Sequence, residues 1–238
     1  MRSTVSAPLS IIIALTLVGC SSATDSGEVV PAESSSKSPT AQASPAESTS
    51  VAQPSFCEPA TAIGREATPV GTPSDLLTRK KFTLTLVTNC GDFEITADAA
   101  AAPATVTTIG FLANNKYYDK TVCHRLTTSG IFVLQCGDPT ATGAGGPGFS
   151  FKDENLPTDA GVNYPKGTVA MANSGPNTNG SQFFLVYKDT TLPPNYTIWG
   201  IITKGLDTLE KIADLGTVDG GPDGNPKFPI EIRTARLS

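Results

Sequence analysis

The sequence has little histidine, no long apolar run and no cluster of basic residues. Its 238 residues include one histidine, one tryptophan and two methionines. A single histidine excludes most zinc sites, and it excludes any Ser-His-Asp triad that is not built on His124. The 17 basic residues are outnumbered by 22 acidic ones and form no run, so we expect no nucleic-acid partner.

The N-terminus has the features of a targeting segment. Residues 9–18 are apolar and follow Arg2, but the run is too short to span a bilayer as a mature helix. It ends in Leu17-Val18-Gly19-Cys20, which looks like a bacterial lipobox. This resemblance implies a signal peptide at residues 1–19 and acyl chains, such as palmitate, at Cys20. The alternative is an ordinary signal peptide in which Cys20 is incidental. We favour an extracytoplasmic lipoprotein, anchored through its lipid to the bacterial cell membrane.

Three further segments follow the signal peptide. Residues 20–55 are rich in Ser, Ala, Thr, Pro and Glu and have almost no large apolar side chains, which predicts a disordered tether. Residues 56–80 contain several prolines without a clear period and form a lead-in. Residues 81–238 carry the apolar patterns of one folded domain.

Four cysteines follow the lipobox, and an exported chain meets an oxidising environment, so we expect disulfides. They are Cys57, Cys90, Cys123 and Cys136. Four cysteines allow three connectivities. We favour Cys57–Cys90, joining the lead-in to the domain, and Cys123–Cys136, across neighbouring strands. One argument opposes the second pair. If Arg125 and Gln135 share a face, strand alternation puts the two cysteines on opposite faces, and a bulge is needed.

The domain combines many short strands with two helices. Alternating apolar and polar residues predict strands at 82–86, 93–96 and 228–232, and further apolar runs predict strands at 131–135, 182–187 and 197–202. Residues 99–114, with a proline in the first turn, and residues 205–215, with one apolar stripe, predict helices. This pattern favours a mainly β domain, a closed barrel with capped ends.

One motif misleads. Residues 143–148 (GAGGPG) match the G-x-G-x-x-G pattern of dinucleotide-binding proteins. Such a site requires a helix directly after the glycines, whereas the strand-like Phe149-Ser150-Phe151 follows here. We therefore interpret this segment as a glycine-rich loop.

The most informative segment is residues 171–184 (MANSGPNTNGSQFF), a polar loop with turn-forming pairs that enters a strand. Upstream lie Cys123-His124-Arg125-Leu126 and residues 131–138 (IFVLQCGD). From about Phe82 to the C-terminus, these motifs resemble the cyclophilin family of peptidyl-prolyl cis/trans isomerases. The resemblance implies a closed eight-stranded antiparallel barrel capped by two helices. It also implies an isomerase without metal or cofactor that acts on proline-containing unfolded or extended polypeptides.

Isomerisation of an X–Pro bond requires no covalent chemistry from the enzyme. The barrier of about 18–20 kcal/mol comes from amide resonance. In the twisted transition state the prolyl nitrogen regains a lone pair and can accept a hydrogen bond. A fixed cationic donor beside that nitrogen therefore favours the transition state over both ground states.

The resemblance assigns roles residue by residue. Arg125 matches the catalytic arginine, Gln135 orients it or binds the substrate backbone, and Phe132 completes the catalytic group. The positions matched to substrate binding are Val133, Ala172, Asn173, Gln182, Phe184, Leu192 and Tyr196.

The sequence departs from the family pattern at several positions. Two extra residues separate Arg125 from Gln135, and Val133 replaces a residue that is often Met, which predicts a wider pocket. Thr191 stands where many members carry Trp, and Tyr196 where they often carry His. We interpret Trp199 as a core residue and His124 as a packed residue rather than a general base.

The sequence thus predicts an isomerase that accelerates the folding of exported proteins. The alternative is a non-catalytic proline-peptide-binding chaperone or scaffold module on the same fold, because fold alone does not fix function. A binding module would be free to lose Arg125, which this chain retains.

Overall fold

A computed structural model describes residues 53–158 and 160–238. The predicted signal peptide, Cys20 and most of the predicted tether lie outside these residues. Within the described residues, no helix combines the length and apolar character needed to cross a bilayer.

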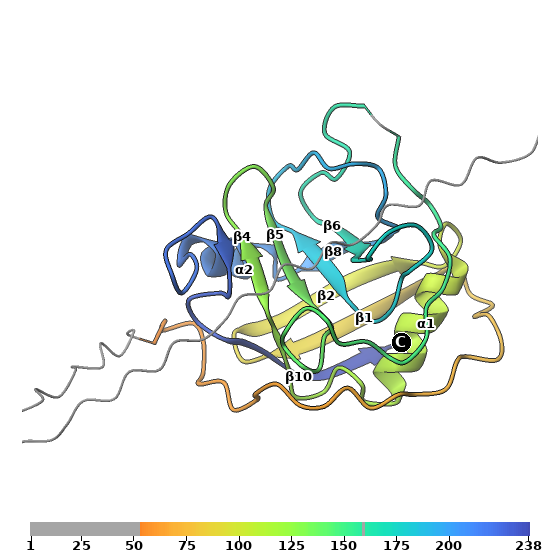
Figure 1. Ribbon diagram of the computed structural model, residues 1–238, viewed down its shortest axis with the longest axis horizontal. Helices are drawn as coiled ribbons and strands as arrows, with labels where there is room; N and C mark the ends of the chain where they lie inside the picture. Colours follow the sequence, from red (N-terminus) through yellow and green to blue (C-terminus); the bar gives the residue numbers. More distant parts are fainter. Residues whose placement is uncertain (1–52, 159) are drawn as a thin grey trace, which may run out of the picture. The chain divides into compact units, whose positions relative to one another are not determined.

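In the described part of the chain, ten strands form one sheet, in the order β3-β10-β1-β2-β8-β6-β7-β5-β4-β9. The strands are β1 (Lys81–Thr88), β2 (Gly91–Asp98), β3 (Thr121–Cys123), β4 (Arg125–Thr127), β5 (Val133–Cys136), β6 (Thr168–Met171), β7 (Phe183–Val186), β8 (Ile198–Lys204), β9 (Asp223–Gly224) and β10 (Ile230–Leu237). Over residues 53–158 and 160–238, two helices, α1 (Pro103–Asn114) and α2 (Leu206–Asp214), accompany the sheet (Figure 1). The expected mainly β class with two helices is confirmed.

The expected closed barrel of eight strands is wrong. The sheet is a curled half-barrel of ten strands that begins with β3 and ends with β9. The count differs because the chain is interrupted at His124. The residues before it form β3 and pair with β10, whereas the residues after it form β4 and pair with β5. The two-residue strand β9 then pairs with β4.

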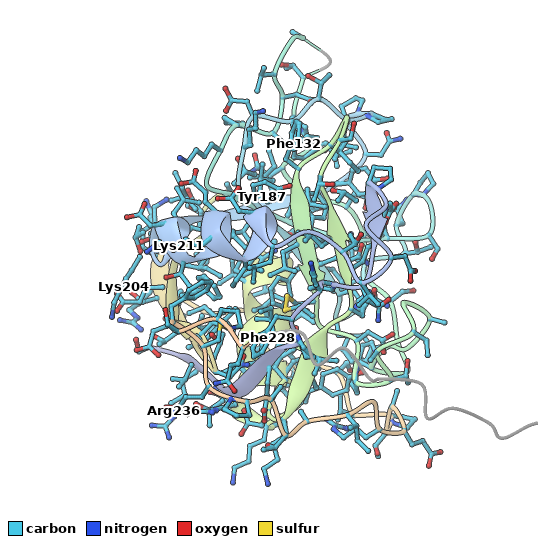
Figure 2. The ribbon with its side chains drawn as sticks, turned by 90° about the vertical axis from the view of Figure 1, so that its left-hand side faces the viewer. Phe132, Tyr187, Lys204, Lys211, Phe228 and Arg236 are labelled. Atoms are coloured by element: carbon cyan, nitrogen blue, oxygen red, sulfur yellow. A yellow bond between two sulfur atoms is a disulfide. The ribbon has the colours of Figure 1, made fainter. Side chains whose placement is uncertain are left out.

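Side-chain alternation builds the inner layer. In β1, Phe82, Leu84 and Leu86 are buried while their neighbours are more exposed. β2 repeats the pattern and pairs antiparallel with β1. The helix α2 buries Leu209 and Ile212 and turns Lys211 outward, as Figure 2 shows.

Helix α1 begins at Pro103, whose missing N–H is not needed in a first turn. Backbone N–H groups in the first turn of α1 have no acceptor within the helix, and a side chain from a distant loop accepts their hydrogen bonds. Glu154 accepts hydrogen bonds from the backbone N–H groups of Ala104 (3.1 Å) and Thr105 (2.8 Å). A carboxylate there also suits the positive end of the helix dipole. The loop after the glycine-rich segment is thereby tied to α1.

Buried apolar side chains form two clusters. The larger one fills the inside of the curled sheet and includes Trp199, so that prediction is confirmed. The smaller one comprises Val133, Tyr164, Ala170, Phe184 and Val186. Its members on β5, β6 and β7 lie on the opposite face of the sheet from the large core. A second apolar surface is thus available outside the main core.

Both predicted disulfides, Cys57–Cys90 and Cys123–Cys136, are present. The objection to the second pair assumed that Cys123 and Arg125 lie in one continuous strand. They do not, because His124 lies outside both β3 and β4. Its backbone N–H still donates to the carbonyl of Gln135 (3.1 Å). This break lets Cys123 reach Cys136 although Arg125 remains paired with Gln135 in the sheet.

Candidate active site

An apolar pocket of about 180 Å³ opens beside the smaller core cluster. It is lined by Arg125, Ile131, Val133, Gln135, Ala172, Asn173, Phe184, Leu192 and Tyr196. These residues come from β4, β5, β7 and the loops after β4, β6 and β7, so no single segment forms the site. Eight of these nine positions are site residues that the sequence analysis predicted.

Arg125 lies at the polar side of this pocket and is held from two directions. Its Nε and Nη2 donate to the two carboxylate oxygens of Asp223 at 2.8 and 2.7 Å. Its Nη1 donates to Oε1 of Gln135 at 3.4 Å. The ion pair with Asp223 raises the pKa of Arg125 further above its usual value. The guanidinium is therefore a permanently charged donor in a fixed orientation.

Gln135 connects Arg125 to a glycine-rich loop. Its Nε2 donates to Oε1 of Gln182 at 2.8 Å. The Nε2 of Gln182 in turn donates to the carbonyls of Gly143 (2.9 Å) and Gly145 (2.8 Å). Each amide oxygen accepts and each amide nitrogen donates along this chain, which fixes the orientation of both glutamines.

Aromatic rings build the apolar wall. The ring of Phe184 lies 5.6 Å from that of Tyr196 and 6.0 Å from that of Tyr164, measured between centroids. The buried hydroxyl of Tyr164 donates to the carbonyl of Tyr196 at 3.1 Å, and burial raises its pKa to about 12. Tyr196 is thereby held beside the pocket, and Val133, which is almost fully buried, adds to this wall.

Beside this pocket lies a larger polar groove of about 580 Å³. It shares Gln135, Ala172 and Asn173 with the apolar pocket, and residues 143–150 form its other side. Asn173 donates from Nδ2 to the carbonyl of Asn195 (2.8 Å), which fixes this shared edge. An extended peptide with an apolar ring in the small pocket would place flanking residues in the groove.

The loop of residues 138–148 is organised around Asp138, which is fully buried. Its carboxylate accepts the backbone N–H groups of Thr140, Thr142, Gly143 and Gly145 at 2.7–3.1 Å. Burial by itself would raise the pKa of Asp138, but these hydrogen bonds, with that of the Thr140 hydroxyl, outweigh it and lower the pKa. In the part of the chain that the structure describes, the next element after this loop is the strand β6, whereas a dinucleotide site needs a helix directly after its glycines.

Two residues lie elsewhere than the motifs suggest. Phe132 is absent from the pocket lining; its ring packs on Tyr187 at 5.9 Å and under Lys188 at 4.5 Å (Figure 2). Strand alternation explains this, because Val133 and Gln135 face the pocket and Phe132 faces the opposite side. Thr191 is exposed, its hydroxyl donates to the carbonyl of Gly161 (3.1 Å), and it does not line the pocket, whereas its neighbour Leu192 does.

His124 is buried beside Asp138 and the Cys123–Cys136 disulfide. Neither ring nitrogen has a hydrogen-bond partner among the described residues. Desolvation lowers the pKa of His124; Asp138 raises it by a smaller amount, and Arg125 lowers it further. The ring is therefore neutral near pH 7 and does not line the pocket, which agrees with a packed residue rather than a general base.

The sequence analysis missed two site residues. Ile131 lines the pocket, and alternation two residues before Val133 would have indicated it. Asp223 is 98 residues from Arg125 and begins the two-residue strand β9, within a segment rich in Gly and Pro. Nothing near Asp223 in the sequence indicates its partner, so only the fold could show this ion pair.

Comparison with known proteins gives a consistent set of relatives. The family model described as cyclophilin type peptidyl-prolyl cis-trans isomerase/CLD matches residues 83–237. The chain is 49% identical over 164 residues to a protein named probable peptidyl-prolyl cis-trans isomerase B of Mycobacterium leprae, covering 64% of this chain and 55% of that one. It is 46% identical over 166 residues to the protein of the same name of Mycobacterium tuberculosis, covering 65% and 54%. The chain thus spans about half the length of these curated relatives.

Solved structures agree. The crystal structure of a cyclophilin type peptidyl-prolyl cis-trans isomerase of Cryptosporidium parvum has a TM-score of 0.57 and 29% identity, covering 66% of this chain and 98% of that one. A second structure of that protein, determined in the presence of the dipeptide Ala-Pro, has a TM-score of 0.56.

Proposed function

Because the chain belongs to the cyclophilin family of peptidyl-prolyl cis/trans isomerases, we propose that it accelerates isomerisation of X–Pro bonds in exported, unfolded or extended polypeptides. Uncatalysed isomerisation takes about 10–100 s, slow enough to limit folding. The Ala-Pro dipeptide used with the Cryptosporidium relative supports proline as the recognised residue.

One observation carries this proposal. A charged guanidinium, Arg125, stands at the edge of an apolar pocket of about 180 Å³ whose floor includes Phe184. The pocket suits a pyrrolidine ring, and the guanidinium suits the prolyl nitrogen at its rim. Asp223 and Gln135 hold that guanidinium in place without using all of its five N–H groups.

The mechanism follows from this arrangement. The pocket holds the ring while the groove beside it fixes the chain through Ala172 and Asn173. As the C–N bond twists, its double-bond character is lost and the nitrogen becomes a hydrogen-bond acceptor. Arg125 then donates to it. No bond to carbon, nitrogen or oxygen is made or broken, and the proton stays on the guanidinium. Only the twisted state gains this hydrogen bond, so the rate rises.

The direct test is isomerisation of a proline peptide by wild type and by Arg125→Ala. We expect Arg125→Ala to lower kcat/KM by at least one to two orders of magnitude, at about 1.4 kcal/mol per factor of ten. Arg125→Lys should also be impaired, because an ammonium lacks the planar fork. Circular dichroism serves as the folding control. Equal activity of folded Arg125→Ala would refute the mechanism, and peptide binding without catalysis by wild type would favour the binding-module alternative.

We propose further that Cys20 carries a lipid and anchors the protein outside the cytoplasm. The support is the lipobox-like Leu17-Val18-Gly19-Cys20 after an apolar run. Cys20→Ala should move the protein from the membrane fraction to the soluble fraction in cell fractionation. Continued membrane association of this variant would contradict the lipoprotein interpretation.

A further inference from the structure

The lead-in of the domain contains a segment without helix or strand that is nevertheless fixed along most of its length. We call residues 57–70 the strap. It precedes residues 83–237, the part matched by the family model. Figure 1 shows the lead-in as the orange trace that passes below β10 and turns upward beside α1.

The first half of the strap is attached to the sheet. Cys57 is bonded to Cys90, and the backbone N–H of Glu58 donates to the carbonyl of Asn89 at 2.7 Å. Three residues later, the backbone N–H of Thr61 donates to the carboxylate of Glu231 at 2.7 Å. Glu231 is buried on β10, whereas Thr61 is exposed, so this hydrogen bond joins the strap to a side chain that the fold holds in place. The strap therefore starts from a rigid position.

The second half of the strap contacts both ends of the loop of residues 138–148, which contains the glycine-rich segment and is called the glycine-rich loop from here on. The backbone N–H of Arg65 donates to the carbonyl of Pro139 at 2.8 Å, and that of Val70 donates to the carbonyl of Pro147 at 3.0 Å. Arg65 is itself anchored, because its Nη2 donates to the carbonyl of Tyr117 at 2.8 Å. The loop between the two prolines is thus held from outside at two points.

The two surfaces also fit closely. A Cβ atom placed on Gly64 would lie 2.3 Å from the carbonyl oxygen of Thr140, closer than any such contact allows. On the loop side, a Cβ atom placed on Gly148 would lie 2.8 Å from Cβ of Pro69. The backbone of the strap at Gly64 therefore lies against the backbone of the loop at Thr140. At the other end, the side chain of Pro69 lies against the backbone of Gly148.

The same loop is part of the active site. The loop accepts a hydrogen bond from the side chain of Gln182 at the carbonyl of Gly143. Gln182 in turn accepts a hydrogen bond from Gln135, and Gln135 accepts one from Arg125. Residues 143–150 of this loop region line the larger groove. A shift of the loop would alter the groove first and would reach Arg125 only through two intervening amides.

We propose that the strap is a specificity element: it positions the glycine-rich loop and thereby sets the shape of the groove that receives residues flanking the proline. This proposal rests on the proposed isomerase function for its substrate. It assigns a positioning role to a segment outside the matched family region. The strap touches neither the apolar pocket nor Arg125, so it acts on the recognition of longer peptides and not on the isomerising step.

Two glycines provide a matched test. The methyl group of Gly64→Ala would clash with the carbonyl oxygen of Thr140, so strap and loop must move apart. Gly71→Ala, just past the strap, makes the same chemical change where no atom lies within 4 Å. Both glycines are exposed, and neither has a positive φ. Peptides of two lengths are compared: one with little beyond Ala-Pro, and longer ones that differ in the residues on each side of it.

We expect Gly64→Ala to change KM for the longer peptides by roughly three- to tenfold, the range of one lost hydrogen bond. The value of kcat, and kcat/KM for the short peptide, should stay near wild type, and Gly71→Ala should match wild type throughout. If the strap only stabilised the fold, Gly64→Ala would lower the unfolding temperature and the fraction of active enzyme. Activity would then fall by the same factor for all peptides. Equal loss on short and long peptides, or no change in Gly64→Ala, would overturn the proposal.

A second measurement keeps this proposal separate from the isomerase function. The backbone amides of Gly143 and Gly145, which donate to Asp138, should exchange hydrogen faster in Gly64→Ala than in Gly71→Ala. Wild type without isomerase activity would refute the proposed function alone. Unchanged exchange at both amides would refute positioning of the loop by the strap, whatever the activity.

Discussion

The ion pair between Arg125 and Asp223 should affect catalysis more than stability. The two side chains are 40% and 50% exposed, so the pair contributes only about 0.2–1 kcal/mol to folding. Its effect on the guanidinium is larger. A free arginine side chain has about 2 kcal/mol of rotamer entropy, and the two bonds to Asp223 restrict that freedom before substrate binds.

Asp223→Ala should therefore lower kcat/KM for a proline peptide by about three- to thirtyfold, because 2 kcal/mol corresponds to roughly a factor of thirty. The loss should be smaller than that of Arg125→Ala, since the donor itself remains. Combining both changes should cost no more than Arg125→Ala alone, because Asp223 acts only through that residue. The assay is protease-coupled or NMR-detected isomerisation, with the unfolding temperature measured in parallel.

Asp219→Ala is the matched control, an exposed acidic residue four positions before Asp223 and outside β9. It should leave kcat/KM unchanged, which separates the specific pair from a general loss of negative charge. Full activity of Asp223→Ala would refute the positioning role. An increase in activity would show instead that Asp223 competes with substrate for the guanidinium.

Two further predictions concern His124 and Thr191. The folded state holds the pKa of His124 below its ordinary value of 6.5, so the unfolded state binds the proton first. The free energy of unfolding should fall as pH drops below about 6.5, by at most about 1.4 kcal/mol per pH unit, until the folded pKa is reached. Urea unfolding at pH 7.5 and 5.5 measures this, and His124→Gln should remove the difference; a difference that persists would point to another group. Cyclosporin-type ligands should bind more weakly than to family members with Trp at the position of Thr191, and Thr191→Trp should tighten binding, because Thr lacks the indole N–H and its apolar area. Tight binding by calorimetry that this change does not alter would contradict that expectation.

Local patterns in the sequence were sufficient for most elements. The alternation through Phe82, Leu84 and Leu86 predicts β1, and the apolar stripe of α2 predicts a helix over residues 205–215 against the observed Leu206–Asp214. The strand count was not predictable in this way. The interruption at His124 divides one run into β3 and β4 because their partners, β10 and β5, lie far apart in the sequence.

The site shows the same division. Arg125, Gln135 and Phe184 lie within motifs, and the structure brings them together around one pocket. Asp223 lies outside any motif, and its role depends entirely on where the chain places it. Phe132 has a matching motif, but alternation turns its ring away from the pocket. Sequence resemblance therefore located the strands of the site better than the direction of each side chain.

The pairing of β1 with β10 joins the two ends of the domain. Leu84 lies opposite Leu237, and Thr83 and Ser238 exchange two backbone hydrogen bonds of 2.9 Å across a separation of 155 residues. Leu237 also packs against Gly110 of α1 so closely that a Cβ atom on that glycine would lie 2.4 Å from it.

This late pairing of β1 with β10 has a consequence for synthesis. While the chain grows, β1 can form a hairpin with β2, but its other edge stays unpaired until the eight residues of β10 have been made. Contacts of such long sequence separation slow folding and leave an edge open to pairing with other chains. A chain truncated before β10 would lose the strand that covers β1 and the leucine, Leu237, that packs on α1. Its nascent form would then be prone to aggregate, even though every residue of the active site had already been made.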